Sequence, residues 1–300
     1  MPHTIAPSQS AHGAAPHLTS GITLPVPGYT RPLQFFVLAT AIPWTLWFAA
    51  AWASRQGEAW LVPGTVLAAL GLAAPLGVAT WMSRNDPALR HDMLRRLIDF
   101  RGVRWYWIAL ACGLMSASIF VATLISLPLG YSPEQFLLRD AITFSAGAMP
   151  AWLVLVGAPI LEELAWHSYG TDALRSRFSV FWTSIVFAAF WAAWHIPLSM
   201  IEGSSQNETV DQGILQALNF PLSIFPFVIL MNWIYYRTGR NITLVIAFHL
   251  SANLASQVVA VHADTELIQT AILLVVMAVV LVADRKLFFD RPERRLTAPA

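Results

Sequence analysis

The sequence predicts an all-α, polytopic integral membrane protein with about eight transmembrane helices in one bundle. Hydrophobic residues make up 56% of the 300 residues and charged residues only 12%, whereas soluble domains are roughly 45–50% apolar and about 25% charged. Apolar stretches of about 20 residues, the length that crosses roughly 30 Å of hydrocarbon, recur along the chain. Basic residues concentrate in alternate connections between these stretches. A single soluble globular domain is therefore excluded.

Eight stretches qualify as spans, and two of them contain interrupting prolines. Pro150 and Pro159 fall in the fourth, and Pro221 and Pro226 in the sixth. Helices inside a bundle tolerate proline because neighbouring groups satisfy the freed carbonyls. The predicted spans are Leu33–Ala53, Trp60–Met82, Trp105–Leu127, Ile142–Glu162, Phe178–Met200, Ile214–Tyr236, Ile242–Val261 and Glu266–Ala283.

The basic residues predict which side of the membrane each connection occupies. With a cytoplasmic N-terminus, 16 of the 18 Lys and Arg residues fall in cytoplasmic tails or connections, and only Arg55 and Arg139 lie outside. This split agrees with the positive-inside rule and with an even number of spans. We therefore expect a multi-pass protein of the cell (cytoplasmic) membrane with both termini in the cytoplasm.

The chain is expected to divide into a bundle and two tails. Residues 1–31 show no apolar period and are expected to form a flexible cytoplasmic tail, residues 32–284 the helical bundle, and residues 285–300 a basic cytoplasmic tail. The connection Arg84–Arg104 places apolar residues between arginines. That spacing fits an amphipathic helix on anionic lipid, and it also fits a basic loop.

Composition limits the partners and cofactors. A net charge of +1 supplies no basic surface for nucleic acid, so we expect membrane lipid as the environment and no nucleic-acid partner. Cys112 is the only cysteine, which excludes an intrachain disulfide and a thiolate metal cluster.

A few ionisable or amide side chains fall within the predicted spans or at their ends. Each costs at least a few kcal/mol in hydrocarbon, so each is a functional candidate. They form three groups along the chain: Glu162 and Glu163 followed by His167, His195 preceded by Trp191, and His249 followed by Asn253.

Helix geometry predicts that these groups meet. Arg177, at a turn between two spans, lies 15 residues after Glu162 and 18 before His195, so an antiparallel hairpin brings those two to a similar depth. His249 and Asn253 are four residues apart and share a helix face. All three groups meet if the first hairpin extends roughly 10 Å further into the cytoplasm than the hairpin carrying His249.

One carboxylate and two imidazoles in a dry cavity supply a general base and hydrogen-bond donors. Glu162, His195 and His249 could equally ligate a catalytic zinc with an open position, although no His-Glu-x-x-His helix is present. We expect metal-free glutamate catalysis without a cofactor, and zinc remains the alternative. His167 can pair with Glu163 one helical turn away, and we expect His167 and Trp191 to support the site by pairing and packing.

These residues resemble the motifs of the CPBP family, the CAAX-protease and bacteriocin-processing intramembrane endopeptidases that include abortive-infection proteins. The family's Glu-Glu-x-x-x-Arg motif matches Glu162 to His167, with His in place of Arg. Its Phe-x-x-x-His motif matches Trp191 to His195, with Trp in place of Phe, and its His-x-x-x-Asn motif matches His249 to Asn253 in full. The resemblance covers about residues 145–265.

The resemblance implies an eight-helix membrane peptidase whose site opens toward the cytoplasm. It implies that Glu162, within the motif's Glu162–Glu163 pair, activates water and that His195 helps to hold that water. His249 and Asn253 would position or stabilise the oxyanion. The expected substrates are membrane-associated or prenylated, CAAX-type peptides. A non-proteolytic scaffold or immunity protein on the same fold, and a proton-coupled transporter, remain the alternatives.

Overall fold

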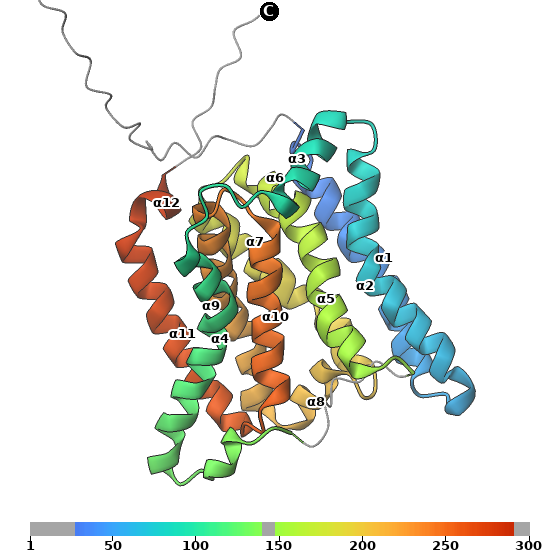
Figure 1. The fold of residues 1–300 in the computed structure, drawn as a ribbon. Helices are drawn as coiled ribbons and strands as arrows, with labels where there is room; N and C mark the ends of the chain where they lie inside the picture. Colours follow the sequence, from blue (N-terminus) through green and yellow to red (C-terminus); the bar gives the residue numbers. More distant parts are fainter. Residues whose placement is uncertain (1–27, 140–147, 291–300) are drawn as a thin grey trace, which may run out of the picture.

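The protein is an all-helical bundle in the part of the chain that the computed structural model describes, residues 28–139 and 148–290. Figure 1 shows the long helices running roughly side by side, with the short helices at the two ends of the bundle. The helices are α1 (Pro32–Ala53), α2 (Leu61–Ser83), α3 (Pro87–Ile98), α4 (Trp105–Ser126), α5 (Ala151–Ala165), α6 (Thr171–Arg175), α7 (Val180–Trp194), α8 (Ser205–Asp211), α9 (Ile214–Arg237), α10 (Ile242–Val258), α11 (Ala263–Ala283) and α12 (Arg285–Phe289).

Six of the helical segments in the described residues are long and apolar enough to cross a membrane: α1, α2 with the turn before it, α4 with the turn after it, α7 with the turn after it, α9 and α11. The remaining two predicted spans correspond to α5, with 15 residues, and α10, with 17. The polytopic all-α class is therefore confirmed, whereas the count of eight spans is not.

Two predicted span boundaries differ from the observed helices by more than three residues, and proline explains both. The fourth span was expected from Ile142, but α5 begins at Ala151, directly after Pro150; residues 140–147 lie outside the described part. The fifth was expected to run to Met200, but α7 ends at Trp194 and a 3₁₀ turn follows over Ile196–Met200. A ring at Pro197 would clash with the carbonyl four residues earlier in a continued α-helix.

The interior prolines of α5 and α9 do not end those helices. α9 continues through Pro221 and Pro226 to Arg237. After Pro159, α5 passes into a π-helix over Trp166–Gly170 and then directly into α6. π-Helical turns inside α-helices are rare and are frequent at functional sites.

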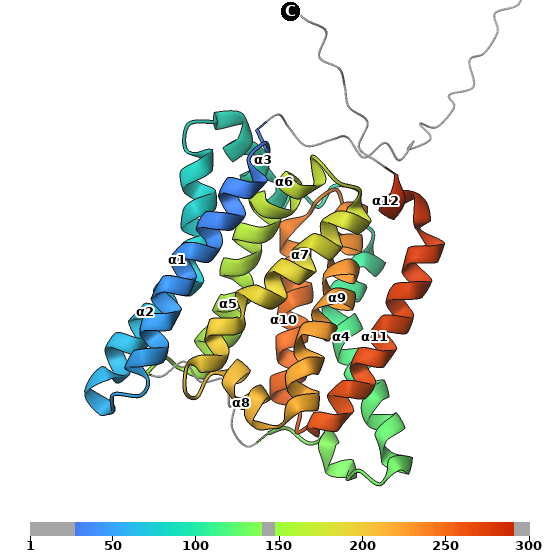
Figure 2. The same cartoon turned by 180° about the vertical axis from the view of Figure 1, so that it is seen from behind.

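Helices α1 and α2 form a hairpin that stands apart from the other long helices at one end of the molecule. Figures 1 and 2 show the two helices tilting away from α5 and α7 toward the end that carries α8. At the opposite end, where α3, α6 and α12 lie, α1 approaches the bundle. The divergence leaves room for a cavity between the hairpin and α5.

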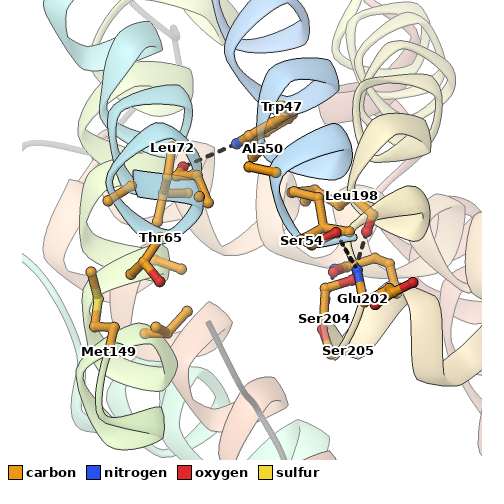
Figure 3. Close-up of a pocket in the computed structure, with 18 of the residues that line it drawn as sticks. Trp47, Ala50, Ser54, Thr65, Leu72, Met149, Leu198, Glu202, Ser204 and Ser205 are labelled. Atoms are coloured by element: carbon orange, nitrogen blue, oxygen red, sulfur yellow. Dashed lines mark hydrogen bonds between the residues drawn. The ribbon is translucent and has the colours of Figure 1, made fainter. Parts of the chain in front are cut away.

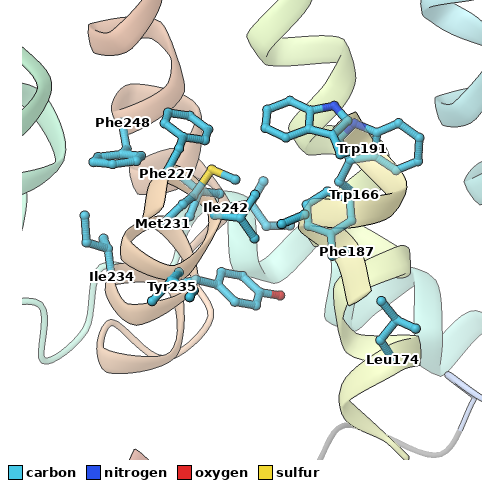
Figure 4. Close-up of a cluster of buried hydrophobic side chains, with 14 of the residues drawn as sticks. Trp166, Leu174, Phe187, Trp191, Phe227, Met231, Ile234, Tyr235, Ile242 and Phe248 are labelled. Carbon is cyan, nitrogen blue, oxygen red and sulfur yellow. The ribbon is translucent and has the colours of Figure 1, made fainter. Parts of the chain in front are cut away.

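Aromatic side chains fill the centre of the bundle (Figure 4). Trp166, Phe187, Trp191, Phe227 and Phe248 are all buried. The Trp191 ring stacks on Phe187 with centroids 5.8 Å apart and lies 5.7 Å from Phe227. Because interiors are close-packed, such large rings fix the rotation of α7 against α9.

Helix α3 is fastened to the bundle by a buried arginine. Arg96 is 2% exposed and pairs with Asp92 at 3.0 Å and with Asp172 of α6 at 2.8 Å. Its guanidinium also donates to the carbonyls of His167 and Ser168, at 3.0 and 2.7 Å, in the π-helix. Of the two alternatives for the Arg84–Arg104 connection, a helix and a basic loop, the structure shows a helix over Pro87–Ile98, while its contact with lipid stays a prediction.

Asp92 lies between two cations, Arg96 and Arg240. Burial raises the pKa of the Asp92 carboxyl, but the two arginines and the hydrogen bond from Tyr29 outweigh burial and lower that pKa below its ordinary value of 3.8. The carboxylate is therefore charged and paired in the folded protein.

Ordered structure extends beyond the predicted bundle of residues 32–284. Tyr29 is 2% exposed and donates to Asp92 at 2.8 Å, and α12 buries Leu287 and Phe288. Residues 1–27 and 291–300, which make up most of the two predicted tails, lie outside the described part.

Candidate active site

A cavity of about 390 Å³ lies between the α1–α2 hairpin, α5 and the segment from His195 to Gln206 (Figure 3). Its walls are mainly apolar and include Trp47, Leu72 and Leu161. Glu162 and His195, which the sequence placed at a similar depth, line this same cavity. The two side chains therefore face one cavity, as the hairpin argument requires, while their equal depth stays a prediction.

Of the α5 residues that line the cavity, Glu162 lies furthest along the helix from its first residue, Ala151. It lies 11 residues after the first residue of α5, which corresponds to about 17 Å along the helix axis. Its side chain is nearly buried, with the residue 5% exposed. A carboxylate at this depth is costly unless it is hydrogen-bonded, so its partners determine what it can do.

Two indole N–H groups hold one oxygen of the Glu162 carboxylate. Oε2 accepts from Nε1 of Trp191 at 2.9 Å and from Nε1 of Trp166 at 3.5 Å. Among the described residues, no donor contacts Oε1. One oxygen is thus fixed in place, and the other is available to bind and deprotonate a water molecule.

His195 follows the last residue of α7. Its Nδ1 lies 2.6 Å from the carbonyl oxygen of Trp191. A carbonyl only accepts, so Nδ1 carries a proton, and in the neutral ring Nε2 keeps its lone pair. Because α7 ends at Trp194, the His195 ring lies in the wall of the cavity, and the residue is 8% exposed.

The second glutamate has a different environment. Glu163 is fully buried and does not line the cavity. Its carboxylate lies between two imidazoles: His249 Nδ1 is 2.7 Å from Oε1, and His167 Nδ1 contacts Oε2. The predicted pairing of Glu163 with His167 is confirmed, and the structure adds His249 as a second partner.

A buried chain of polar groups continues from His167. Its Nε2 lies 3.0 Å from Oδ1 of Asn232, whose amide donates to Ser184 Oγ at 2.9 Å. Sequence reasoning did not select Asn232, although an amide within a predicted span carries the same desolvation signal that selected His195. Trp166 was also missed, since a tryptophan in a membrane span gives no polar signal.

Trp191 connects the two halves of the site. Its indole donates to Glu162, and its ring lies 5.3 Å from those of His195 and His249. The predicted meeting of Glu162, His195 and His249 therefore takes place around Trp191, while His249 itself hydrogen-bonds Glu163. Asn253 is half-buried, and its amide makes only a long contact of 3.5 Å with the carbonyl of Leu155.

The alternative of a zinc site at Glu162, His195 and His249 requires three ligating side chains around one point. Across residues 28–139 and 148–290, no three His, Cys, Asp or Glu side chains come together in a way that could hold a metal ion. Glu162, His195 and His249 do not form such a group. The described residues do not fit a three-ligand zinc site, and we derive no step through a metal.

A carboxylate and an imidazole at the inner end of a cavity in a polytopic bundle fit a membrane-embedded hydrolase. Residues 144–255 match the family model described as type II CAAX prenyl endopeptidase Rce1-like. The chain is 34% identical over 266 residues to CAAX prenyl protease 2 of Methanococcus maripaludis, a match covering 87% of this chain and 97% of that protein. The chain belongs to this family of Rce1-like CAAX prenyl endopeptidases. Of the three functions left open by the sequence, membership supports the membrane endopeptidase.

Proposed function

We propose that this protein hydrolyses a peptide bond in a membrane-anchored, lipidated substrate of CAAX type, using water activated by Glu162. One observation carries the proposal: the Glu162 carboxylate lies at the inner end of the cavity with Oε2 held by two indole N–H groups and Oε1 without a donor. The name of the Methanococcus relative supports the substrate class. We place the bundle in the cytoplasmic membrane.

The proposed reaction uses Glu162 and His195 on one water molecule. Oε1 of Glu162 takes a proton from the water as its oxygen attacks the scissile carbonyl, while Nε2 of His195 accepts the second hydrogen bond and orients the water. The protonated Glu162 then gives its proton to the leaving amine as the C–N bond breaks. The products are a carboxylate and an amine, and the base is regenerated.

His249 and Asn253 are proposed to stabilise the oxyanion. The buried carboxylate of Glu163 accepts from Nδ1 of His249 and fixes the orientation of the ring; when both ring nitrogens carry a proton, Nε2–H is left as a donor. The Asn253 amide is only weakly engaged and can turn toward the substrate. Glu163, predicted among the catalytic residues, is in this account a positioning residue for His249.

Cleavage by the purified protein in detergent tests the proposal. The substrate is a farnesylated CAAX peptide, and its unprenylated form measures the contribution of the lipid. Glu162→Gln and His195→Ala should each lower kcat by at least about 100-fold, since a general base typically contributes 10²–10⁴. Glu134→Gln, the same change at an exposed position, is the matched control. Wild-type cleavage by Glu162→Gln would overturn the proposal.

A chelator separates carboxylate catalysis from zinc catalysis. Full cleavage in the presence of a zinc chelator supports water activation by Glu162 alone. Loss of cleavage that added Zn²⁺ restores would overturn that part of the proposal and leave the endopeptidase assignment in place.

A further inference from the structure

A chain of hydrogen bonds with a fixed direction leads from α7 through α9 to His167. It begins at the backbone carbonyl of Val180, which accepts from the hydroxyl of Ser184 at 2.8 Å. A hydroxyl has one proton, so the Ser184 oxygen presents only lone pairs to its other neighbour. That neighbour is Asn232 of α9, whose amide nitrogen lies 2.9 Å away. The amide nitrogen therefore donates to Ser184, and this contact fixes which way the amide group is turned.

The orientation of Asn232 determines one of the two ring protons of His167. With its nitrogen turned to Ser184, the amide presents Oδ1 to Nε2 of His167 at 3.0 Å. An amide oxygen only accepts, so Nε2 must carry a proton. All three side chains are fully buried, and bulk water does not compete for these hydrogen bonds.

The other ring nitrogen of His167 faces Glu163. Nδ1 contacts Oε2 of the Glu163 carboxylate, four residues earlier in the chain. An ionised carboxylate also only accepts, so Nδ1 carries a proton as well. A ring with protons on both nitrogens is an imidazolium, and all its N–H groups have acceptors. The two residues then form a buried ion pair whose polar atoms are hydrogen-bonded, the condition under which such a pair persists.

No other charge near the His167 ring takes the place of Glu163. Arg96 of α3 donates to the His167 carbonyl, but its own charge is balanced by Asp172 of α6 at 2.8 Å. Tyr235 of α9 places its ring 4.8 Å from the imidazole and donates its hydroxyl to the same carbonyl. Helices α1, α2 and α7 contain no charged residue. The counter-charge of His167 is therefore the Glu163 carboxylate.

We propose that Asn232, oriented by Ser184, keeps His167 as an imidazolium that holds Glu163 ionised and turned toward His249. An ionised Glu163 accepts from Nδ1 of His249 at 2.7 Å and so orients the ring that is proposed to stabilise the oxyanion. Asn232 and Ser184 are thus positioning residues of the site. The effect on cleavage rests on the proposed function, whereas the protonation of His167 does not depend on it.

This arrangement accounts for the departure from the family motif at residue 167. Arginine, which the motif has at this position, is always cationic and needs no neighbour to keep its charge. A histidine can lose its proton near neutral pH. In this chain, the oxygen of Asn232 keeps the second N–H of the imidazole paired and so preserves the positive charge beside Glu163.

NMR of ¹⁵N in the histidine rings measures this protonation directly in the full-length protein in detergent. At about pH 8 an ordinary histidine, with a pKa near 6.5, is neutral and has one protonated and one unprotonated ring nitrogen. His167 should instead show two protonated nitrogens, in a signal identified by its loss in His167→Gln. A neutral pattern for His167 at this pH would overturn the proposal, because the proton shared with Glu163 would then belong to the carboxyl.

Two substitutions separate the acceptor of Asn232 from the size of its side chain. Asn232→Asp keeps an oxygen for Nε2 of His167, and Asn232→Leu is of similar size without one. Asn232→Leu should lose the two-proton signal at about pH 8 and lower kcat for the farnesylated peptide at least about tenfold. KM should change little, because Asn232 does not line the cavity. Asn232→Asp should keep the signal and retain kcat within about threefold of wild type.

Asn219→Leu, the same change at a half-buried position of α9, is the matched control and should keep both the signal and kcat. Retention of the two-proton signal in Asn232→Leu would overturn the role of Asn232. Equal losses of kcat in Asn232→Leu and Asn232→Asp would overturn it as well. Absence of all cleavage by the wild-type protein would count against the proposed function and leave the NMR result intact.

Discussion

Replacing Trp191 by phenylalanine separates the indole N–H from the ring that carries it. Trp191 Nε1 donates to Glu162 at 2.9 Å, while the ring stacks on Phe187 and contacts both site histidines. Phenylalanine, the residue in the family motif, keeps an aromatic ring and removes the donor. We therefore expect Trp191→Phe to fold normally and to leave Glu162 held only by the longer bond from Trp166.

The size of the effect follows from the bond that is lost. A hydrogen bond to a charged group contributes about 1.5–3 kcal/mol, and about 1.36 kcal/mol is tenfold in rate. If the whole free energy of this hydrogen bond stabilises the transition state, Trp191→Phe lowers kcat/KM by roughly 10- to 150-fold. Steady-state cleavage of the farnesylated peptide in detergent measures this, and the thermal unfolding midpoint checks that the fold is unchanged.

Trp166→Phe is the matched control. Its Nε1 lies 3.5 Å from the same oxygen of Glu162, at the limit of hydrogen bonding, so the same chemical change should cost only a few-fold in kcat/KM. Cleavage by Trp191→Phe within twofold of wild type would refute the view that this indole positions the base. An equal loss in both variants would show that ring packing, and not the shorter hydrogen bond, matters.

Three further outcomes are expected from the buried polar groups. Arg96→Met should lower the free energy of unfolding, by up to about 3–5 kcal/mol, because it removes one of the two arginines that pair with the buried carboxylates of Asp92 and Asp172; Arg90→Met, at an exposed position, should change it little, and equal effects would contradict a stabilising role of Arg96. His167→Ala and Asn232→Ala should each slow cleavage and couple by roughly 0.5–3 kcal/mol in a double-mutant cycle, whereas additive effects would show that the two act separately. The pKa of Asp92 is lowered in the folded state, so its stabilising contribution is present above pH 3.8 and is lost as pH falls through the lowered pKa; acid titration of unfolding should show this loss in wild type and not in Asp92→Asn.

The sequence alone determined the class of fold and the main candidates for chemistry. Apolar length and the clustering of arginines predict a polytopic helical bundle, because hydrocarbon excludes charge and unpaired backbone groups. The same cost selects Glu162, His195 and His249, since a polar side chain persists in a span only with a partner or a role. Counting residues from Arg177 brings Glu162 and His195 to one depth because helix rise is constant.

Only the tertiary structure decided which groups touch. Whether His249 meets Glu162 or Glu163 depends on the rotation of α10 against α5, which packing sets and hydropathy does not. In the same way, Arg96 pairs with the buried Asp172 while Arg90 of the same helix is exposed. The positions of the arginines in the sequence do not predict which of them is buried. The cavity lies where α1 and α2 diverge from α5. Such divergence depends on side-chain contacts between helices that lie about a hundred residues apart in the chain.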